Sequence, residues 1–458
     1  MLLRNLLIAK GLLILTWFLK PRRIAFSLAG YHKKGTIMHQ PELLQPKHLP
    51  TKNRWSSLFA ALPVWPQPPR SRGRKPVDRN ALLRTLIYQR LSRVRFLQQI
   101  CNQLADNPPL LAEMGFDPYS SGPTLERLSS FLSDPEHHRC LVAIRVELVL
   151  QLIAERVISP AHIGLDSCPV ASWVKENNLK TALRRWRYDK NTPPKADPDA
   201  RLGVSIHFPH EKGSSLHYFW GYRNHVLADL ESELPLWEIT EPNSIGEPTV
   251  AHALLEAASI LPVRVRSVSA DAEYDSDAIL NTIHHDLQAE AFVAVNPSHL
   301  AKTKGFRRDG NNVFCPADVP MYRSGKMNQK ERVYIQYRCP FYRGPKPDLL
   351  MCPIDHPNFS TQKGCNYLWR ITPNPRDQIP YGTDYFKQHY ARRTAIERGF
   401  SRLLSLTIQE PTVRGLVSIR NHCTITHIAV LLVALTAHRH GLHDKIRFCR
   451  SLVPNFLS

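Results

Sequence analysis

The sequence predicts a mixed α/β protein that starts with a helical domain and carries a β-rich insertion before its C-terminal helices. Apolar residues recur at helical spacing between residues 75 and 155. After Pro160, short runs alternate apolar with polar residues and then take a strand–helix–strand order. Residues 313–372 return to strand-like segments, and 384–440 read as two long helices. We therefore expect a mixed sheet with flanking helices.

The N-terminal 54 residues read as an extension that is neither an anchor nor a signal peptide. Its uninterrupted apolar run, residues 11–19, falls well short of the ~20 residues that a membrane span needs. No A-x-A cleavage site follows, and translation from Met38 is one hypothesis for the origin of this segment. Residues 55–74 are rich in proline and basic residues, which favours an extended connector over a helix.

Residues 75–158 form the predicted helical domain. Its apolar positions at helical spacing are Leu82, Leu83, Leu86, Ile87, Leu91, Val94, Leu97 and Ile100. Ser121 or Thr124 is expected to cap a further helix.

The arginines between the apolar positions could dock on DNA or lie solvated on a packing domain; they are Arg84, Arg90, Arg93, Arg95 and Arg127. A later apolar stretch, 425–435, is too short for a membrane span and predicts a buried helix.

The charge of the chain favours a polyanionic partner. The 60 Lys and Arg residues exceed the 39 Asp and Glu residues, giving a net charge of +21 spread along 458 residues. Such an excess favours nucleic acid, because binding to phosphates releases counterions, although a basic surface without a partner shares this signal. The nine cysteines, an odd number without dense spacing, are typical of a reduced cytosolic chain.

Four cysteines fall in the predicted insertion, at Cys315, Cys339, Cys352 and Cys365. A zinc knuckle needs paired Cys-x2–4-Cys spacing, which these residues lack even if His356 takes the place of one ligand. Buried or incidental thiols are therefore favoured over a structural zinc site. The aromatic and basic run at 322–347 suits a DNA strand, although a solvated β-hairpin is the plainer interpretation.

Three acidic residues suggest a divalent-metal site. Asp166 ends the apolar stretch AHIGLD, and Asp271 ends VRSVSAD, so both are expected at or just past the C-terminal end of a strand. Either residue alone is more often a turn or capping residue, and it is the pair that favours a metal site. Tyr390, Arg393 and Glu397 are spaced three and four apart, which predicts a stripe on one helical face that continues to Leu404. Three carboxylates are hard oxygen ligands of the kind that hold Mg²⁺ for phosphodiester chemistry.

Four segments resemble successive blocks of bacterial insertion-sequence transposases, which carry an Asp-Asp-Glu catalytic triad on a ribonuclease H-like fold. The segments are IGLDSCPVA, YFWGYRNHVLADLESELPLWEIT, VSADAEYDSD and YARRTAIERGFSRL. The likeness covers roughly residues 75–440 and includes the signature Tyr-x2-Arg-x3-Glu-x6-Lys near the third acid. It implies that Asp166, Asp271 and Glu397 are the catalytic metal ligands, and that Tyr390 and Arg393 contact DNA phosphates.

The resemblance also implies partners and a domain plan. It implies Mg²⁺ or Mn²⁺, double-stranded DNA as transposon ends and target, a homodimer on DNA, no membrane, and a cytoplasmic, nucleoid-associated location. The helical domain would bind DNA, and the ribonuclease H-like catalytic domain would comprise residues 159–300 and 373–440. Residues 301–372 would be the insertion and 441–458 a C-terminal tail.

The chain departs from the signature in two places. The signature lysine falls at Leu404, so that phosphate contact is either absent or supplied by Arg398 or Arg402. Glu273 stands where the family usually has glycine. These departures keep two alternatives open, namely a decayed or repurposed DNA-binding protein and a nuclease that never joins ends.

The segment GYRNH is open to two interpretations. Tyr222, Arg223 and His225 form either a row of DNA contacts, as the resemblance implies, or an alternating strand with its polar face in water. The structural interpretation is slightly favoured.

Overall fold

The computed structural model describes residues 54–67, 77–178, 188–207, 215–297, 305–329, 332–341, 352–354 and 364–449. The expected N-terminal extension, up to residue 53, lies outside the described residues. The chain divides into two compact units. The first unit comprises Met1–Arg264 and Thr394–Ser458, and the second comprises Val265–Arg393. Antiparallel and parallel strand pairs both occur alongside helices, which confirms the predicted mixed α/β class.

Four strands form the sheet of the first unit, and they confirm the short strand-like runs that the sequence predicts after Pro160. They are β1 (His162–Ala171), β2 (Arg201–His207), β3 (Ser215–Asp229) and β4 (Pro235–Pro242). β3 pairs antiparallel with each of the other three. β3 is buried on both faces from Phe219 to Asp229, except for the half-buried Arg223. Helix α8 (Glu247–Ser259) packs on β3 and β4.

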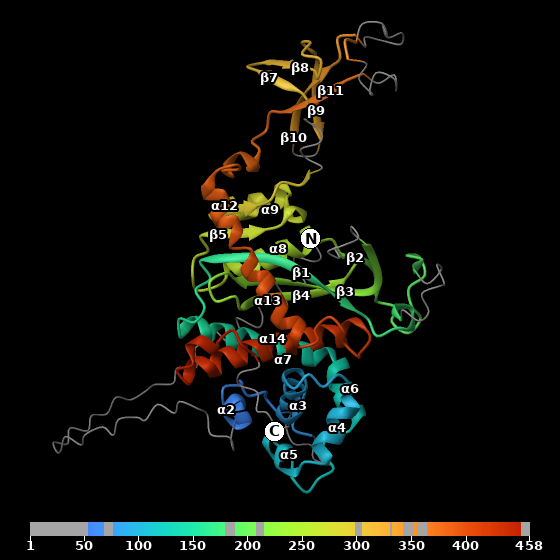
Figure 1. The fold of residues 1–458 in the computed structure, drawn as a ribbon, viewed down its shortest axis with the longest axis vertical. Helices are drawn as coiled ribbons and strands as arrows, with labels where there is room; N and C mark the ends of the chain where they lie inside the picture. Colours follow the sequence, from blue (N-terminus) through green and yellow to red (C-terminus); the bar gives the residue numbers. More distant parts are fainter. Residues whose placement is uncertain are drawn as a thin grey trace, which may run out of the picture. The chain divides into compact units, whose positions relative to one another are not determined.

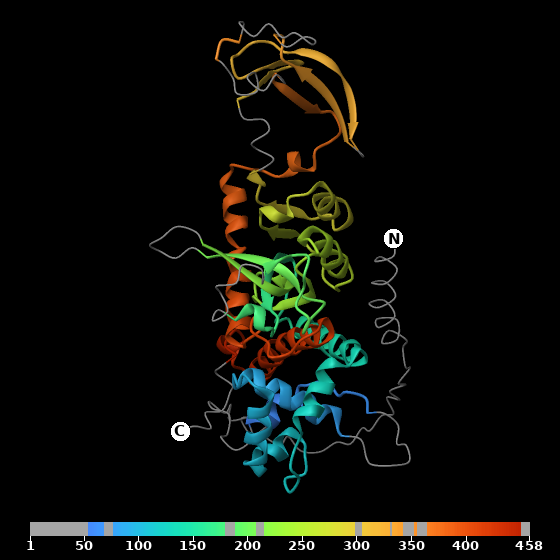
Figure 2. The same cartoon turned by 90° about the vertical axis from the view of Figure 1, so that its right-hand side faces the viewer.

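Helices build the remainder of the first unit. They are α2 (Arg54–Ala60), α3 (Arg79–Leu91), α4 (Leu97–Ala105), α5 (Pro108–Met114), α6 (Leu125–Ser133), α7 (Pro135–Ala154), α13 (Thr394–Ser405) and α14 (Leu416–Arg439). Thr124 caps α6 by accepting the backbone N–H of Arg127. α14 packs on β4 and α7, and also on α2, α3 and α6, so it lies between the sheet and the N-terminal helices (Figures 1 and 2).

α14 is long and apolar enough to cross a membrane by length and composition. However, 83% of its most apolar window is buried inside the protein. This burial agrees with the prediction of a buried core helix over 425–435, because a helix that is apolar on all sides needs protein around it.

The prediction of an extended connector from residue 55 onward is wrong at its start, because α2 occupies Arg54–Ala60. Trp55, Leu58 and Phe59 follow helical spacing and are all buried, with the Trp55 ring 4.9 Å from that of Tyr88. Trp65 is also buried, 5.2 Å from the Phe131 ring. Burial of these aromatic rings outweighs the influence of the prolines. Residues 68–76 lie outside the described part of the chain.

Several polar residues that could have faced DNA or water lie inside the first unit. Arg90 is buried, donates to Gln89 Oε1 at 2.6 Å and contacts His422 Nδ1 at 2.8 Å, so it neither docks on DNA nor lies in solvent. Tyr222 and His225 are fully buried, which contradicts both the DNA-contact row and the water-facing strand for these two residues. The Tyr222 hydroxyl donates to Asp197, also fully buried, at 2.7 Å.

A buried polar network joins the sheet to α14. Glu238 accepts hydrogen bonds from Thr424 Oγ1 at 2.6 Å and from Asn224 Nδ2 at 2.9 Å. His427 Nε2 donates to Asn224 Oδ1 at 3.0 Å. Burial lowers the pKa of His427 to about 4, so its ring is neutral at pH 7.

This depressed pKa predicts a loss of stability in mild acid. The unfolded chain protonates His427 near pH 6.5 and the folded chain only near pH 4, so the free energy of unfolding falls as pH drops between these values. We expect the fall between pH 7.5 and 5.0, measured by urea unfolding, to be up to about 2 kcal/mol smaller in His427→Gln than in the wild type. Gln keeps an N–H donor for Asn224, and His225 titrates in both proteins. An equal decrease in the free energy of unfolding of the two proteins over this pH range would contradict the prediction.

The second unit is built on two parallel strands, β5 (Ser267–Ala270) and β6 (Glu290–Val293). Between them lie α9 (Asp277–Asn281) and a π-helical turn (Thr282–Asp286), which confirms the predicted βαβ order. Helix α12 (Asp384–Ala391) packs on β5 and β6, and its His389 ring stacks on Phe292 at 4.7 Å.

The insertion belongs to the second unit and contains the predicted strands. They are β7 (Arg307–Asp309), β8 (Asn312–Phe314), β9 (Tyr322–Gln329), β10 (Arg332–Arg338) and β11 (Asn366–Arg370). The predicted hairpin is β9–β10, and β11 pairs with β10 on its other side. Residues 330–331 and 342–351 lie outside the described residues.

The four insertion cysteines share the small core of the insertion. Cys315, Cys339 and Cys365 are buried in it beside Val313 and Tyr337, and Cys352 packs against it. Burial raises the pKa of Cys365 to about 11, with a further contribution from the neighbouring thiols. The thiol of Cys365 is therefore protonated at neutral pH, and all four cysteines are free of disulfides.

Candidate active site

Asp166 lies in the middle of β1, opposite Val226 of β3. The expectation that it ends a strand is wrong, because Cys168 and Val170 continue the buried alternation and extend the strand to Ala171. One carboxylate oxygen, Oδ1, accepts the backbone N–H of Ser167 at 2.8 Å. The half-buried Asp166 side chain lies on the same face of the strand as Gly164 and Cys168.

The opposite face of β1 carries a polar cluster that sequence reasoning missed. Ser167 Oγ donates to Glu247 Oε1 at 2.7 Å and accepts from Arg223 Nη1 at 3.1 Å. Arg223 also forms an ion pair with Glu247 at the start of α8. This pairing gives Arg223 a structural role in joining β3 to α8.

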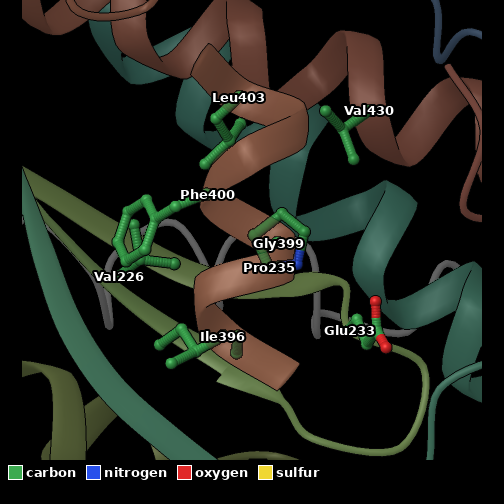
Figure 3. A pocket seen from close by; sticks show the side chains of 9 residues that line it. Val226, Glu233, Pro235, Ile396, Gly399, Phe400, Leu403 and Val430 are labelled. Carbon is green, nitrogen blue, oxygen red and sulfur yellow. The ribbon is translucent and has the colours of Figure 1, made fainter. Parts of the chain in front are cut away.

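Glu397 is placed by α13, which covers the Asp166 face of the sheet. The apolar side of α13 is buried, while Glu397 in its first turn is exposed. Ile396 and Phe400 face Val226, the strand partner of Asp166 (Figure 3). A Cβ atom at Gly164 would lie 3.7 Å from Ile396 Cδ1, so α13 passes close to β1 two residues before Asp166. Asp166 and Glu397 therefore belong to the same face of the first unit.

The predicted continuous stripe of Tyr390, Arg393 and Glu397 is interrupted in the structure. α12 ends at Ala391 and α13 begins at Thr394, so the region 384–440 holds three helices and not two. The backbone N–H of Arg393 bonds to the carbonyl of Tyr390 at 2.9 Å, which is an i to i+3 turn. Because this bond takes a carbonyl that an α-helix would offer to residue i+4, the α-helical ladder stops there. Tyr390 and Glu397 thus lie on different helices.

Asp271 follows β5 directly, as predicted, and also acts as a cap. Its Oδ1 accepts the backbone N–H of Glu273 at 2.9 Å at the start of a 3-10 turn, Ala272–Tyr274. Glu273 is exposed on this turn. The structure thus shows the capping role of Asp271.

The loop after Asp271 is tied to the insertion by arginines, which sequence reasoning did not find. Asp277 forms ion pairs with Arg332 of β10 at 3.0 Å, with Arg370 of β11 and with Arg376 at 2.7 Å. Arg376 also contacts Asp275 at 2.7 Å. The arginines outweigh the effect of burial and hold the pKa of Asp277 below its ordinary value.

Asp166 and Glu397 carry carboxylate oxygens of the kind that a magnesium site would need. Mg²⁺ is usually held by one or two protein carboxylates, with water and substrate phosphate completing its shell. Two carboxylates on one face of the first unit fit that donor set, and each is accessible to solvent. No group of three or more His, Cys, Asp or Glu side chains able to hold a metal ion occurs among the described residues.

The model of the transposase DDE domain family matches residues 203–432, just over half of the 458-residue chain. This chain belongs to the DDE transposase family. The matched part runs from β2 into α14 and includes Asp271 and Glu397, while Asp166 lies upstream of it.

No curated protein matches this DDE transposase. A search of solved structures finds the piggyBac transposase synaptic complex with hairpin DNA, at 11% sequence identity and a TM-score of 0.33. The match covers 88% of this chain and 75% of the piggyBac chain.

The basic residues near Glu397 differ in how far they are available to a ligand. Arg402 is only 14% exposed and forms an ion pair with Glu233 at 2.9 Å. Arg398 is 58% exposed and also pairs with Glu233, at 2.7 Å. In this DDE transposase Arg398 is therefore the more accessible of the two arginines, and Leu404 is exposed at the position of the signature lysine.

Proposed function

We propose that this DDE transposase binds the terminal inverted repeats of a mobile element and catalyses metal-dependent cleavage and joining of DNA. The observation that carries the proposal is the packing of α13 on the Asp166 face of the first unit, which brings the first and third predicted acids to one face. The family match supports the same reaction class. The strands and helices around Asp166 are consistent with a ribonuclease H-like catalytic domain.

Asp166, Asp271 and Glu397 would hold Mg²⁺ or Mn²⁺ in this proposal. When bound, such ions activate the attacking water or 3′-hydroxyl and stabilise the leaving oxygen of the phosphodiester. The carboxylates supply negative oxygen donors, and Asp166 keeps its orientation through the Ser167 N–H. Arg398, Arg393 and Tyr390 would contact the DNA phosphates beside the acids.

The net charge of +21 supports duplex DNA as the partner, in the form of both element ends and target. Because two ends must be joined to one target, we propose a homodimer on DNA in the bacterial nucleoid. The helical N-terminal segment would contribute to end binding through those arginines that remain at its surface, such as Arg95.

The test uses purified full-length protein and labelled duplexes that carry the inverted repeats flanking its own gene. We expect nicking at the repeat boundary and joined products only when Mg²⁺ or Mn²⁺ is present. Binding without any metal-dependent nicking would overturn the proposal in favour of a DNA-binding protein. Hydrolysis without joined products would overturn it in favour of a nuclease.

A further inference from the structure

The turn between β3 and β4 places one acidic residue against the helix that carries Glu397. Glu233 lies in this turn with φ = +62°, in the left-handed region that non-glycine residues rarely adopt. Its backbone N–H bonds to the carbonyl of Asp229 at 2.9 Å, and Asp229 Oδ2 accepts the N–H of Ser232 at 2.8 Å. A backbone in this unfavourable region persists where surrounding contacts fix it.

Three arginines that lie far from Glu233 along the chain contact its side chain. Oε1 accepts from Arg398 Nε at 2.7 Å and from Arg447 Nη1 at 3.2 Å, and Oε2 accepts from Arg402 Nη1 at 2.9 Å. A second nitrogen of Arg402 donates to the Glu233 carbonyl. The Glu233 side chain is 4% exposed and that of Arg402 is 14% exposed, so the ion pair between them is shielded from water. Although burial raises it, the arginines hold the pKa of Glu233 below its ordinary value.

The contacts fix both the rotation and the axial position of α13. Arg398 and Arg402 are four residues apart, one turn of the helix, and both reach the same carboxylate. Gly399 lies between them, and a Cβ atom there would come within 3.3 Å of the Glu233 carbonyl oxygen. Glu233 lines the small hollow between α13 and the strands together with Ile396 and Gly399 (Figure 3). A shift of the helix along its axis would break the two ion pairs together.

We propose that Glu233 is a positioning residue of the transposase site, which sets where Glu397 lies on the Asp166 face by holding Arg398 and Arg402 of α13. This inference rests on the proposed function, because Glu397 matters only if it holds a metal ion. Glu233 itself touches neither DNA nor metal. It acts through the helix, whose first turn carries Glu397 one residue before Arg398.

Two measurements on full-length Glu233→Ala and Glu233→Gln test the proposal. Hydrogen exchange over residues 394–405 should speed up about tenfold or more in Glu233→Ala, because removing the partner of a buried charge weakens local stability. The Mg²⁺ concentration for half-maximal cleavage should rise about fivefold or more, while affinity for the repeat DNA stays within about twofold. Glu233→Gln keeps one oxygen acceptor and should show smaller changes in both measurements.

Glu155→Ala is the matched control, because it breaks an ion pair with Arg439 at 2.7 Å in the same unit but away from α13. It should leave both the exchange of 394–405 and the Mg²⁺ midpoint at wild-type values. If Glu233→Ala does not fold, Glu233→Gln alone decides the outcome through the same two measurements.

The outcomes separate this inference from the proposed function. Wild-type exchange of 394–405 in the Glu233 variants would overturn the inference whether or not the wild type cleaves DNA. Faster exchange with an unchanged Mg²⁺ midpoint would also overturn it, because Glu233 would then only stabilise the fold. A wild type that never cleaves would overturn the proposed function, and the positioning role with it.

Discussion

Glu397→Gln and Asp166→Asn should each abolish metal-dependent DNA cleavage while leaving DNA binding intact. Both substitutions keep the shape of the side chain and remove the negative charge that a divalent ion needs. Several kcal/mol of transition-state stabilisation depend on the ion, so we expect a loss of cleavage rate of about 10³-fold or more. Folding should be unaffected, because Glu397 is exposed and the amide oxygen introduced by Asp166→Asn would still accept the Ser167 N–H.

The measurement is single-turnover cleavage of labelled repeat DNA, with binding followed separately by gel shift. Glu410→Gln is the control, since Glu410 is an exposed carboxylate that pairs with Arg95 at 3.4 Å and lies beyond the end of α13. Near-normal cleavage by Glu397→Gln or Asp166→Asn would remove that residue from the catalytic set.

Glu238→Ala should destabilise the protein strongly. Glu238 is buried and accepts hydrogen bonds from Thr424 and Asn224, so its loss removes a charged acceptor from both side chains. The loss of Glu238 also takes away the negative charge near the buried guanidinium of Arg145. Arg145 donates to the Leu236 carbonyl at 2.9 Å and stacks on the Trp237 ring, and neither contact is with a negative charge. Breaking a buried charge network in this way costs about 3–5 kcal/mol.

Urea unfolding at pH 7.5 measures this loss as a lower midpoint with an unchanged slope. Glu241→Gln provides the comparison on the same strand, because Glu241 forms a partly exposed ion pair with Arg420 at 2.6 Å. Such a pair contributes only about 0–1 kcal/mol. Equal effects of the two substitutions would show that the buried network adds nothing to stability.

Strand and helix patterns were predictable from the sequence because they depend on local alternation. β1 to β4, α8, β5 and β10 follow the apolar periodicity of their own residues. β7 and β9 of the insertion are mostly polar and exposed. The errors occurred where one residue decides a boundary. The turn at Arg392 and Arg393 breaks a helix through two consecutive i to i+3 bonds, and α2 forms because distant Tyr88 covers Trp55. The apolar periodicity of a helix or strand shows which of its faces is buried, but it does not show which other element packs on that face.

The acids of the candidate site could be found from the sequence, but the residues around them could not. Asp166, Asp271 and Glu397 stand in recognisable motifs. The partners of Glu233 lie 165 to 214 residues away along the chain, so no local sequence pattern predicts these contacts. The same holds for Asp277 and its arginines, which are brought together only when the insertion folds.

Trp55 and Trp65 have a practical consequence for studies of the N-terminal helices. A shortened chain starting at residue 75, where the amphipathic pattern begins, would lack both indole rings and uncover the rings of Tyr88 and Phe131. It would also lose the hydrogen bond of 2.8 Å that the backbone N–H of Trp65 donates to Asn80 Oδ1 at the beginning of α3. Fragments intended for DNA-binding measurements on the N-terminal helices alone therefore need to start before Trp55. Fragments that start later will expose an apolar surface that promotes self-association.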